Sequence, residues 1–251
     1  MRIRAIAFLA ALLLAATAWA GDPWKEKPYK QWTEKEAFKV LNESPWSRAV
    51  SVNAPWKAKG HDTAARGPYG EPSAASRGAY GEKAAAGERP TGPTQDEGQA
   101  QATETTFQVR WTSARTMRQA LARLLVLRGA TQESESEKLV AQQPQEYELA
   151  VLGQDMTPFQ QTDEIRLKEK AYLRPKKSKQ KLSPSRVEIR RADDGKTVRQ
   201  VVFYFSKKTD VGEPVVTPDE KGIDFALQAG EVELKVSFEP QKMAAKEGQD
   251  L

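Results

Sequence analysis

The stretch VEIRRADDGKTVRQVVFYF, residues 187–205, decides the fold. Two β-rich arms flank Asp194-Gly195, and an Asp-Gly pair between such arms is a strong signal for a β-hairpin. A second hairpin is expected over 223–238, where two runs of alternating apolar residues are joined by Ala229-Gly230. Strands joined by short hairpins run antiparallel, so both stretches predict an antiparallel sheet.

The residues before these hairpins add further strands and helices. Residues 106–111 and 146–153 alternate between apolar and polar side chains, which is typical of half-buried strands. Three segments have helical character, the first with Ser113 as its expected cap: 114–128, 133–142 and 157–170. Together they predict an α+β fold, a largely antiparallel sheet of about six strands with two or three helices. We expect the first helix to cover one face of this sheet.

A short helical segment is predicted near the N-terminus, over 21–56. In Thr33-Glu34-Lys35-Glu36 the threonine hydroxyl and the last glutamate can each bind the other's backbone N–H, which is a capping box. Pro45 ends this helix, and Ser44-Pro45 is expected to start a second short helix that reaches Val50. Helices of this length are marginal alone, so their apolar face must dock on another surface.

This segment is rich in tryptophan, with four such residues: Trp24, Trp32, Trp46 and Trp56. Two interpretations remain open. The tryptophans either dock on the C-terminal domain of the same chain or bind a partner or a glycan, because tryptophan is enriched at binding hot spots. In the second interpretation Trp32 and Trp46 are the candidate binding residues.

The pattern W-x4-A-x3-L-x2-SPW, over residues 32–46, is similar to the N-terminal segment of a group of exported bacterial proteins. That group lies near the GWxTD-domain proteins, although the Gly-Trp-x-Thr-Asp signature itself is absent here. The resemblance implies export, and it implies no particular reaction.

The first twenty residues predict a signal peptide. Arg2 and Arg4 precede an apolar run over 5–16, and Ala18-Trp19-Ala20 has the small residues that signal peptidase requires. The alternative, an N-terminal membrane anchor, is disfavoured because a spanning helix needs roughly 20 apolar residues. We expect cleavage after Ala20, a periplasmic or secreted protein and no transmembrane segment in the mature chain. Loss of the two arginines lowers the formal net charge from +5 to +3.

Residues 57–105 are predicted to be a disordered linker. They contain eight of the 16 glycines and none of the large aliphatic residues, so they cannot form a core. An 11-residue unit that begins at Arg66 is repeated at Arg77 with seven identical positions. The only histidine, His61, lies here and is interpreted as a solvated loop residue. The α+β domain is expected over 106–240, and a flexible tail over 241–251.

The composition excludes most catalytic chemistry. The chain has no cysteine and one histidine, so a thiolate metal site, a disulfide framework and a cysteine nucleophile are impossible. We therefore expect no cofactor, no metal and no catalytic residue. A carboxylate-dependent hydrolase is the one enzymatic alternative, since several acids lie near one another in the sequence: Glu146, Glu148, Asp155, Asp163 and Glu164.

A basic stretch over 166–191 is the second candidate binding feature. Its tentative binding residues are the cations Lys168, Lys170, Arg174, Lys176, Lys177, Lys179 and Lys181. Such a stretch can attract an anionic glycan or lipid surface, or it can be a solvated loop that joins a helix to the sheet. Nucleic acid is not expected, because only Tyr172 offers an aromatic platform there.

These observations predict an exported, non-enzymatic protein that mediates protein or cell-envelope contacts. The alternative is a binding module for anionic glycan or lipid that uses the basic stretch, and a hydrolase is the weakest hypothesis.

Overall fold

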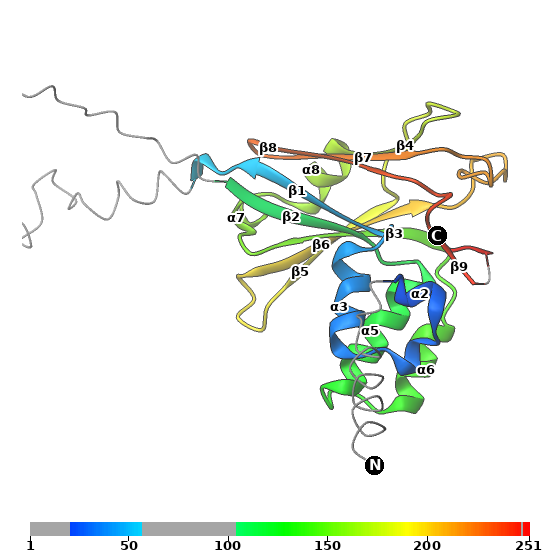
Figure 1. Cartoon of the computed structure of the whole chain (residues 1–251). Helices are drawn as coiled ribbons and strands as arrows, with labels where there is room; N and C mark the ends of the chain where they lie inside the picture. Colours follow the sequence, from blue (N-terminus) through cyan, green and yellow to red (C-terminus); the bar gives the residue numbers. More distant parts are fainter. Residues whose placement is uncertain (1–20, 57–103, 247) are drawn as a thin grey trace, which may run out of the picture.

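The structure is a computed structural model that describes residues 21–56, 104–246 and 248–251. The expected signal peptide, almost all of the expected linker with its repeat, and His61 lie outside the described residues. Two antiparallel sheets face each other, and a group of helices lies against one end of the larger sheet (Figure 1). The predicted α+β class is confirmed.

The larger sheet has five strands, all paired antiparallel, in the order β1-β2-β3-β6-β5. In chain order these strands are β1 (Ser47–Asn53), β2 (Glu104–Trp111), β3 (Glu146–Gly153), β5 (Arg186–Arg191) and β6 (Val198–Ser206). The predicted hairpin between β5 and β6 is confirmed. Gly195 has a φ of 65° there, a conformation that glycine adopts without a steric penalty.

The smaller sheet has three strands in the order β4-β7-β8. They are β4 (Ala171–Pro175), β7 (Ile223–Ala229) and β8 (Val232–Phe238). The second predicted hairpin, with Gly230 in its turn, is confirmed as β7–β8. Two very short strands, β9 (Ala244–Ala245) and β10 (Gly248–Gln249), pair near the C-terminus.

The core lies between the two sheets. Alternate residues of each strand point inward, so aromatic side chains from the facing sheets meet. The rings of Phe203 and Phe225 are 5.4 Å apart between centroids, and those of Trp111 and Phe238 are 5.3 Å apart. Both pairs are edge-to-face, the arrangement that the ring quadrupoles favour. All four side chains are fully buried.

The helices form two groups. The first, beneath one end of the larger sheet, comprises α2 (Pro23–Glu26), η1 (Tyr29–Gln31), α3 (Glu34–Glu43), α5 (Arg115–Leu127) and α6 (Glu133–Ala141). The second comprises α7 (Thr157–Gln160) and α8 (Glu164–Lys170). Helix α5 confirms the helix expected over 114–128, but it packs against α3 and α6 rather than across the sheet. Part of the outer sheet face therefore stays open.

Residues 21–56 belong to the same sheet and core as the rest of the chain. The second short helix expected after Ser44-Pro45 is wrong, because residues 47–53 form β1 and pair with β2 over its whole length. Arg48, Val50 and Val52 alternate with small residues that are mostly exposed, which suits a strand with one face inward. The segment at 21–56 therefore packs with the C-terminal part of the same chain, which is one of the two interpretations left open by the sequence.

Two further details differ from the sequence prediction. Residues 171–175, expected to lie in a solvated loop, form β4 with Ala171 and Leu173 buried. The helix expected over 157–170 is divided, because the Asp163 carboxylate accepts a hydrogen bond from the Arg166 N–H at 2.8 Å and starts α8 as a new helix. The capping box at Thr33 and Glu36 is confirmed.

The C-terminal segment is docked rather than free, which corrects the flexible tail expected over 241–251. Met243 is fully buried. The two carboxylate oxygens of Asp250 accept hydrogen bonds of 2.7 Å from the N–H groups of Arg115 and Thr116, so Asp250 caps α5. The cap expected from Ser113 is not formed, and the buried Ser113 hydroxyl has no partner among the described residues.

Candidate functional site

The outer face of the five-stranded sheet carries a small apolar patch of its own. Ala150, Val202 and Tyr204 are buried there and Leu152 packs beside them, apart from the core between the sheets. Their position follows from register, because Ala150 lies opposite Val202 on the neighbouring strand. Strands β3 and β6 are thus apolar on both faces, and the outer patch forms the floor of a hollow.

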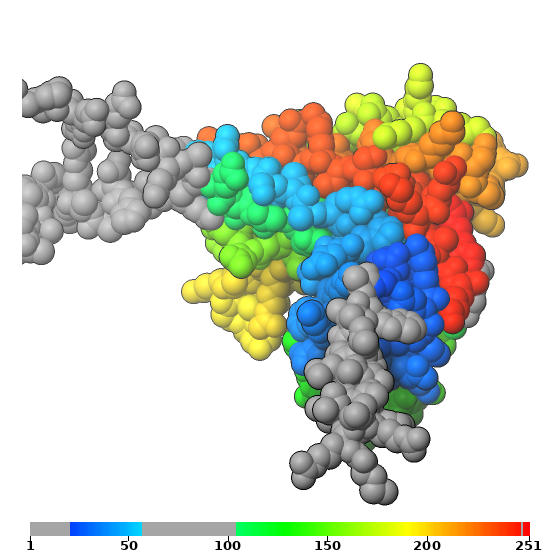
Figure 2. All heavy atoms as spheres, viewed as in Figure 1, coloured from blue at the N-terminus to red at the C-terminus, as the bar shows by residue number. Residues whose placement is uncertain are grey.

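This hollow, here called the outer-sheet cleft, lies between the sheet and the helical group. Its volume is about 380 Å³. In the space-filling view it is the notch between the β5–β6 hairpin and the helices (Figure 2). Polar groups and apolar groups both line it. The polar and charged ones are Arg110, Thr112, Arg118, Gln142, Glu148, Arg190, Gln200 and Tyr204. The apolar ones are Leu41, Met117, Leu121, Leu139, Pro144, Ala150, Leu152 and Val202.

Arg110 projects from β2 at one side of the cleft. One of its terminal nitrogens donates a 2.7 Å hydrogen bond to the Asn42 side-chain oxygen at the end of α3. Among the described residues it forms no ion pair, and its buried Nε has no hydrogen-bond acceptor. Burial lowers the pKa of this guanidinium below its ordinary value, because a charged group loses hydration there.

Arg118 enters the cleft from α5. Its Nη1 donates to the carbonyls of Leu139, Val140 and Gln142, where α6 ends. A cation at a helix C-terminus is stabilised by the helix dipole, which fixes the position of this side chain. Among the described residues Arg118 has no carboxylate partner, and burial is the main cause that lowers the pKa of its guanidinium.

Glu148, on β3, is the carboxylate that lines the cleft. Its side chain is half-buried and forms no hydrogen bond or ion pair within the described part of the chain. Burial raises the pKa of the Glu148 carboxyl, although Arg190, Arg186 and Arg118 oppose that shift with their positive charges. A half-buried carboxylate without a partner is energetically unfavourable, and such groups are concentrated at functional sites.

The far wall of the cleft is a closed polar network. The Arg190 guanidinium binds both oxygens of Glu188 at 3.1 Å, and the Tyr204 hydroxyl donates to Glu188 at 2.7 Å. These bonds lower the pKa of the Glu188 carboxyl. The Arg186 guanidinium stacks 3.3 Å from the centroid of the Tyr204 ring. Because its charge is already compensated, Arg190 is less available to a ligand than Arg110 or Arg118.

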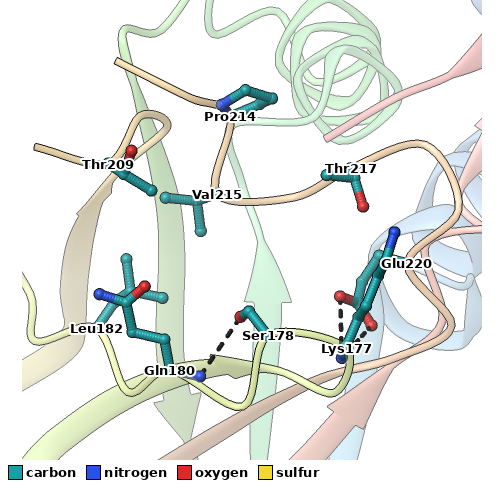
Figure 3. A pocket seen from close by; sticks show the side chains of 9 residues that line it. All are labelled: Lys177, Ser178, Gln180, Leu182, Thr209, Pro214, Val215, Thr217 and Glu220. Carbon is teal, nitrogen blue, oxygen red and sulfur yellow. Dashed lines mark hydrogen bonds between the residues drawn. The ribbon is translucent and has the colours of Figure 1, made fainter. Parts of the chain in front are cut away.

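A second hollow, of about 360 Å³, lies between the loop after β4 and the segment 209–220 (Figure 3). Glu220 is 2% exposed, and its carboxylate accepts hydrogen bonds from the backbone N–H groups of Lys177, Lys221 and Gly222. The nearby Ser178 hydroxyl accepts from the N–H of Gln180. The Glu220 carboxylate therefore has its hydrogen-bond donors in the two loops that it holds together, which indicates a structural role.

The candidate tryptophans are core residues. Trp32 is 1% exposed and donates from its indole nitrogen to the carbonyls of Pro23 and Lys27. Trp46 is fully buried, packs edge-to-face on Trp24 at 5.8 Å, and donates to the Asp250 carbonyl. A buried ring cannot stack on a partner or a glycan, so the interpretation in which they dock on the same chain holds.

The candidate basic residues are spread over three elements. Lys168 and Lys170 lie on α8, while Lys177 and Lys179 lie in the loop after β4. The others are on the outer side of the smaller sheet: Arg174 and Lys176 pair with Asp224, and Lys181 lies over the Tyr172 ring. Lys177 pairs with Asp219. None of these seven cations lines the outer-sheet cleft.

The candidate acids are dispersed as well. Glu146 pairs with Arg186 and accepts a hydrogen bond from Ser185, and Asp155 accepts hydrogen bonds from Trp56 and from the Thr157 N–H. Asp163 and Glu164 belong to α8 and its cap. Glu148 is thus the member of this set that lines the cleft.

The described residues contain neither a cluster of metal ligands nor a membrane-spanning helix. Within them, no three histidine, cysteine or acidic residues are grouped so that they could hold a metal ion. No helix in the same part of the chain is long and apolar enough to cross a membrane.

Reasoning from sequence missed Arg110, Arg118, Gln200 and Tyr204 as site residues. One signal was available: residues 149–152 and 201–205 are apolar at consecutive positions rather than at alternate ones. Such strands are covered on both faces, so the outer face had to carry a second apolar surface. Residues of α5 and α6 lie opposite that surface. The apolar pattern of the strands does not specify where these two helices pack.

Comparisons with protein families, with curated proteins and with solved structures found no match for this chain.

Proposed function

We propose that the protein is an exported, non-enzymatic binding protein, and that the outer-sheet cleft holds a small organic carboxylate with an apolar part. The observation that carries this proposal is the pair Arg110 and Arg118: two half-buried guanidinium groups that form no ion pair with any described residue, beside an apolar floor. Partly desolvated cations are costly without an anion, and a bound carboxylate would supply it.

The size of the cleft favours a small ligand. Small-molecule sites enclose roughly 300–1,000 Å³, and the cleft volume of about 380 Å³ lies at the lower end of that range. A ligand with a branched aliphatic part would cover Ala150 and Val202 while its carboxylate faces the arginines. Glu148 is the one acid among the lining residues, so the cleft offers no pair of carboxylates for hydrolysis.

The test is calorimetric titration of the purified protein with 4-methylpentanoate at low ionic strength. We expect saturable binding that weakens roughly tenfold or more in Arg110→Ala, since a hydrogen bond to a charged group contributes about 1.5–3 kcal/mol. Arg110→Lys keeps the charge without the planar fork and is expected to lose less. Arg199→Ala, an exposed arginine outside the cleft, is the matched control and should bind like the wild type.

Unchanged affinity in Arg110→Ala, or no saturable binding by the wild type, would overturn the proposal. The separate hypothesis that the basic stretch binds anionic glycan or lipid stays a prediction. Salt-dependent retention on anionic liposomes tests it, and loss of retention in Lys168→Ala/Lys170→Ala would support it.

A further inference from the structure

Binding of an organic carboxylate does not explain why the cleft also contains the acidic side chain of Glu148. A carboxylate beside an anion site repels the ligand, so a site built only for organic acids gains nothing from it. Yet Glu148 lines the same cleft as Arg110 and Arg118, and it has no hydrogen-bond or ion-pair partner within the described ranges. The cleft therefore holds unpaired charge of both signs.

The register of the sheet fixes how these charges are arranged. Arg110 lies directly opposite Ala150, and Glu148 precedes Ala150 by two residues on the same face of β3. Arg110 and Glu148 are thus diagonal neighbours, about 7–8 Å apart along the sheet. Long side chains at that distance can pair, but Arg110 binds Asn42 instead. The opposite charges are held apart above the apolar floor.

We propose that the outer-sheet cleft binds a zwitterionic α-amino acid with an apolar side chain. In this arrangement the ligand carboxylate faces the Arg110 guanidinium, and its ammonium donates to the Glu148 carboxylate. The side chain covers Ala150 and Val202, with Leu121 of α5 on the opposite wall. The inference rests on the proposed function, which it deepens by naming the class of ligand.

The other ligand chemistries fit these residues less well. A polyanion would leave Glu148 facing negative charge, and it would need an extended track of cations that the cleft does not have. A simple cation would leave Arg110 and Arg118 uncompensated. A zwitterion satisfies both signs at once, and its aliphatic part removes the exposed Leu121 side chain from water.

The experiment compares two probes that share one carbon skeleton. L-Leucine is 4-methylpentanoate with an added α-ammonium group, so their affinity difference isolates the contribution of that group. By calorimetry we expect wild-type protein to bind L-leucine about tenfold or more tightly than 4-methylpentanoate, because a charged hydrogen bond is involved. Glu148→Gln is expected to remove that advantage while it leaves 4-methylpentanoate binding equal or slightly tighter.

Glu169→Gln is the matched control, an exposed glutamate on α8 outside the cleft, and it should keep the leucine preference. Equal affinity of the wild type for the two probes, or an unchanged leucine preference in Glu148→Gln, would overturn this inference. If 4-methylpentanoate still binds in an Arg110-dependent manner, the proposed function stands without it. If neither probe binds, both proposals fail. The wild-type comparison needs no variant, so it decides the matter even if Glu148→Gln folds poorly.

Discussion

The cap of α5 offers the sharpest test of how this fold is held together. Asp250 reaches the helix from the end of the chain and accepts two 2.7 Å hydrogen bonds, from the N–H groups of Arg115 and Thr116. Thr116 is 1% exposed, so water cannot replace the partner of its N–H after truncation. Asp250→Ala removes the carboxylate and leaves the rest of the segment in place.

The expected cost follows from three known contributions. Loss of an N-cap costs about 0.5–2 kcal/mol, and loss of a negative charge at a helix N-terminus costs about 0.3–1 kcal/mol. A buried N–H left without an acceptor costs about 1–3 kcal/mol, which overlaps with the first contribution. We therefore expect Asp250→Ala to lower the free energy of unfolding by about 2 kcal/mol. For a domain of this size that corresponds to a Tm decrease of about 4–8 °C.

Urea unfolding followed by far-UV circular dichroism measures this difference. Asp250→Asn keeps one acceptor oxygen without the charge, so about half of the loss is expected. Ser113→Ala is the informative contrast, because sequence alone assigns the cap to Ser113 while its buried hydroxyl has no partner in the described structure. It should change stability by less than about 0.5 kcal/mol. The reasoning is refuted if Ser113→Ala costs more than Asp250→Ala.

Three further predictions follow from individual contacts. Burial raises the pKa of the Glu148 carboxyl, so just above pH 4.5 the folded state binds more protons than the unfolded state. The free energy of unfolding of the wild type relative to Glu148→Gln should therefore fall as pH rises from there. A difference that stays constant between pH 4 and pH 7 would contradict this. Gly195→Ala should cost about 1 kcal/mol in urea unfolding because of its φ of 65°, with Gly195→Asn costing less. Asn53 and Glu104 lie opposite each other at the ends of β1 and β2, so a short Gly-Ser connector can join the two strands. Replacement of residues 57–103 by such a connector should keep the circular dichroism spectrum and the Tm. A loss of fold would show that the replaced residues are needed.

Local signals predicted much of the secondary structure. The glycines at 195 and 230 specified both hairpins, because their turns need a residue with positive φ and glycine adopts that conformation readily. The helical character of residues 114–128 predicted α5, and the capping box predicted the start of α3. Strand β1 was mistaken for a helix because Ser44-Pro45 is a good helix start, and pairing with β2 overrode that local preference.

The candidate site was much less predictable. The sequence identifies Glu148 as an acid that alternates with core residues, but the residues around it in the cleft come from β2, β5, β6 and the helices α3, α5 and α6. Trp32 and Trp46 were candidates for binding, and only their burial in the structure assigns them to the core.

The sequence by itself determined the fold class, the hairpins, the main helices and the absence of thiol chemistry. These properties depend on composition and on residues that are close in the chain. The tertiary structure alone decided that residues 21–56 complete the larger sheet, that Asp250 caps α5, and that Arg110, Arg118 and Glu148 share a cleft without pairing. Each of these brings together residues far apart in sequence, so it depends on how whole elements pack and not on any local pattern.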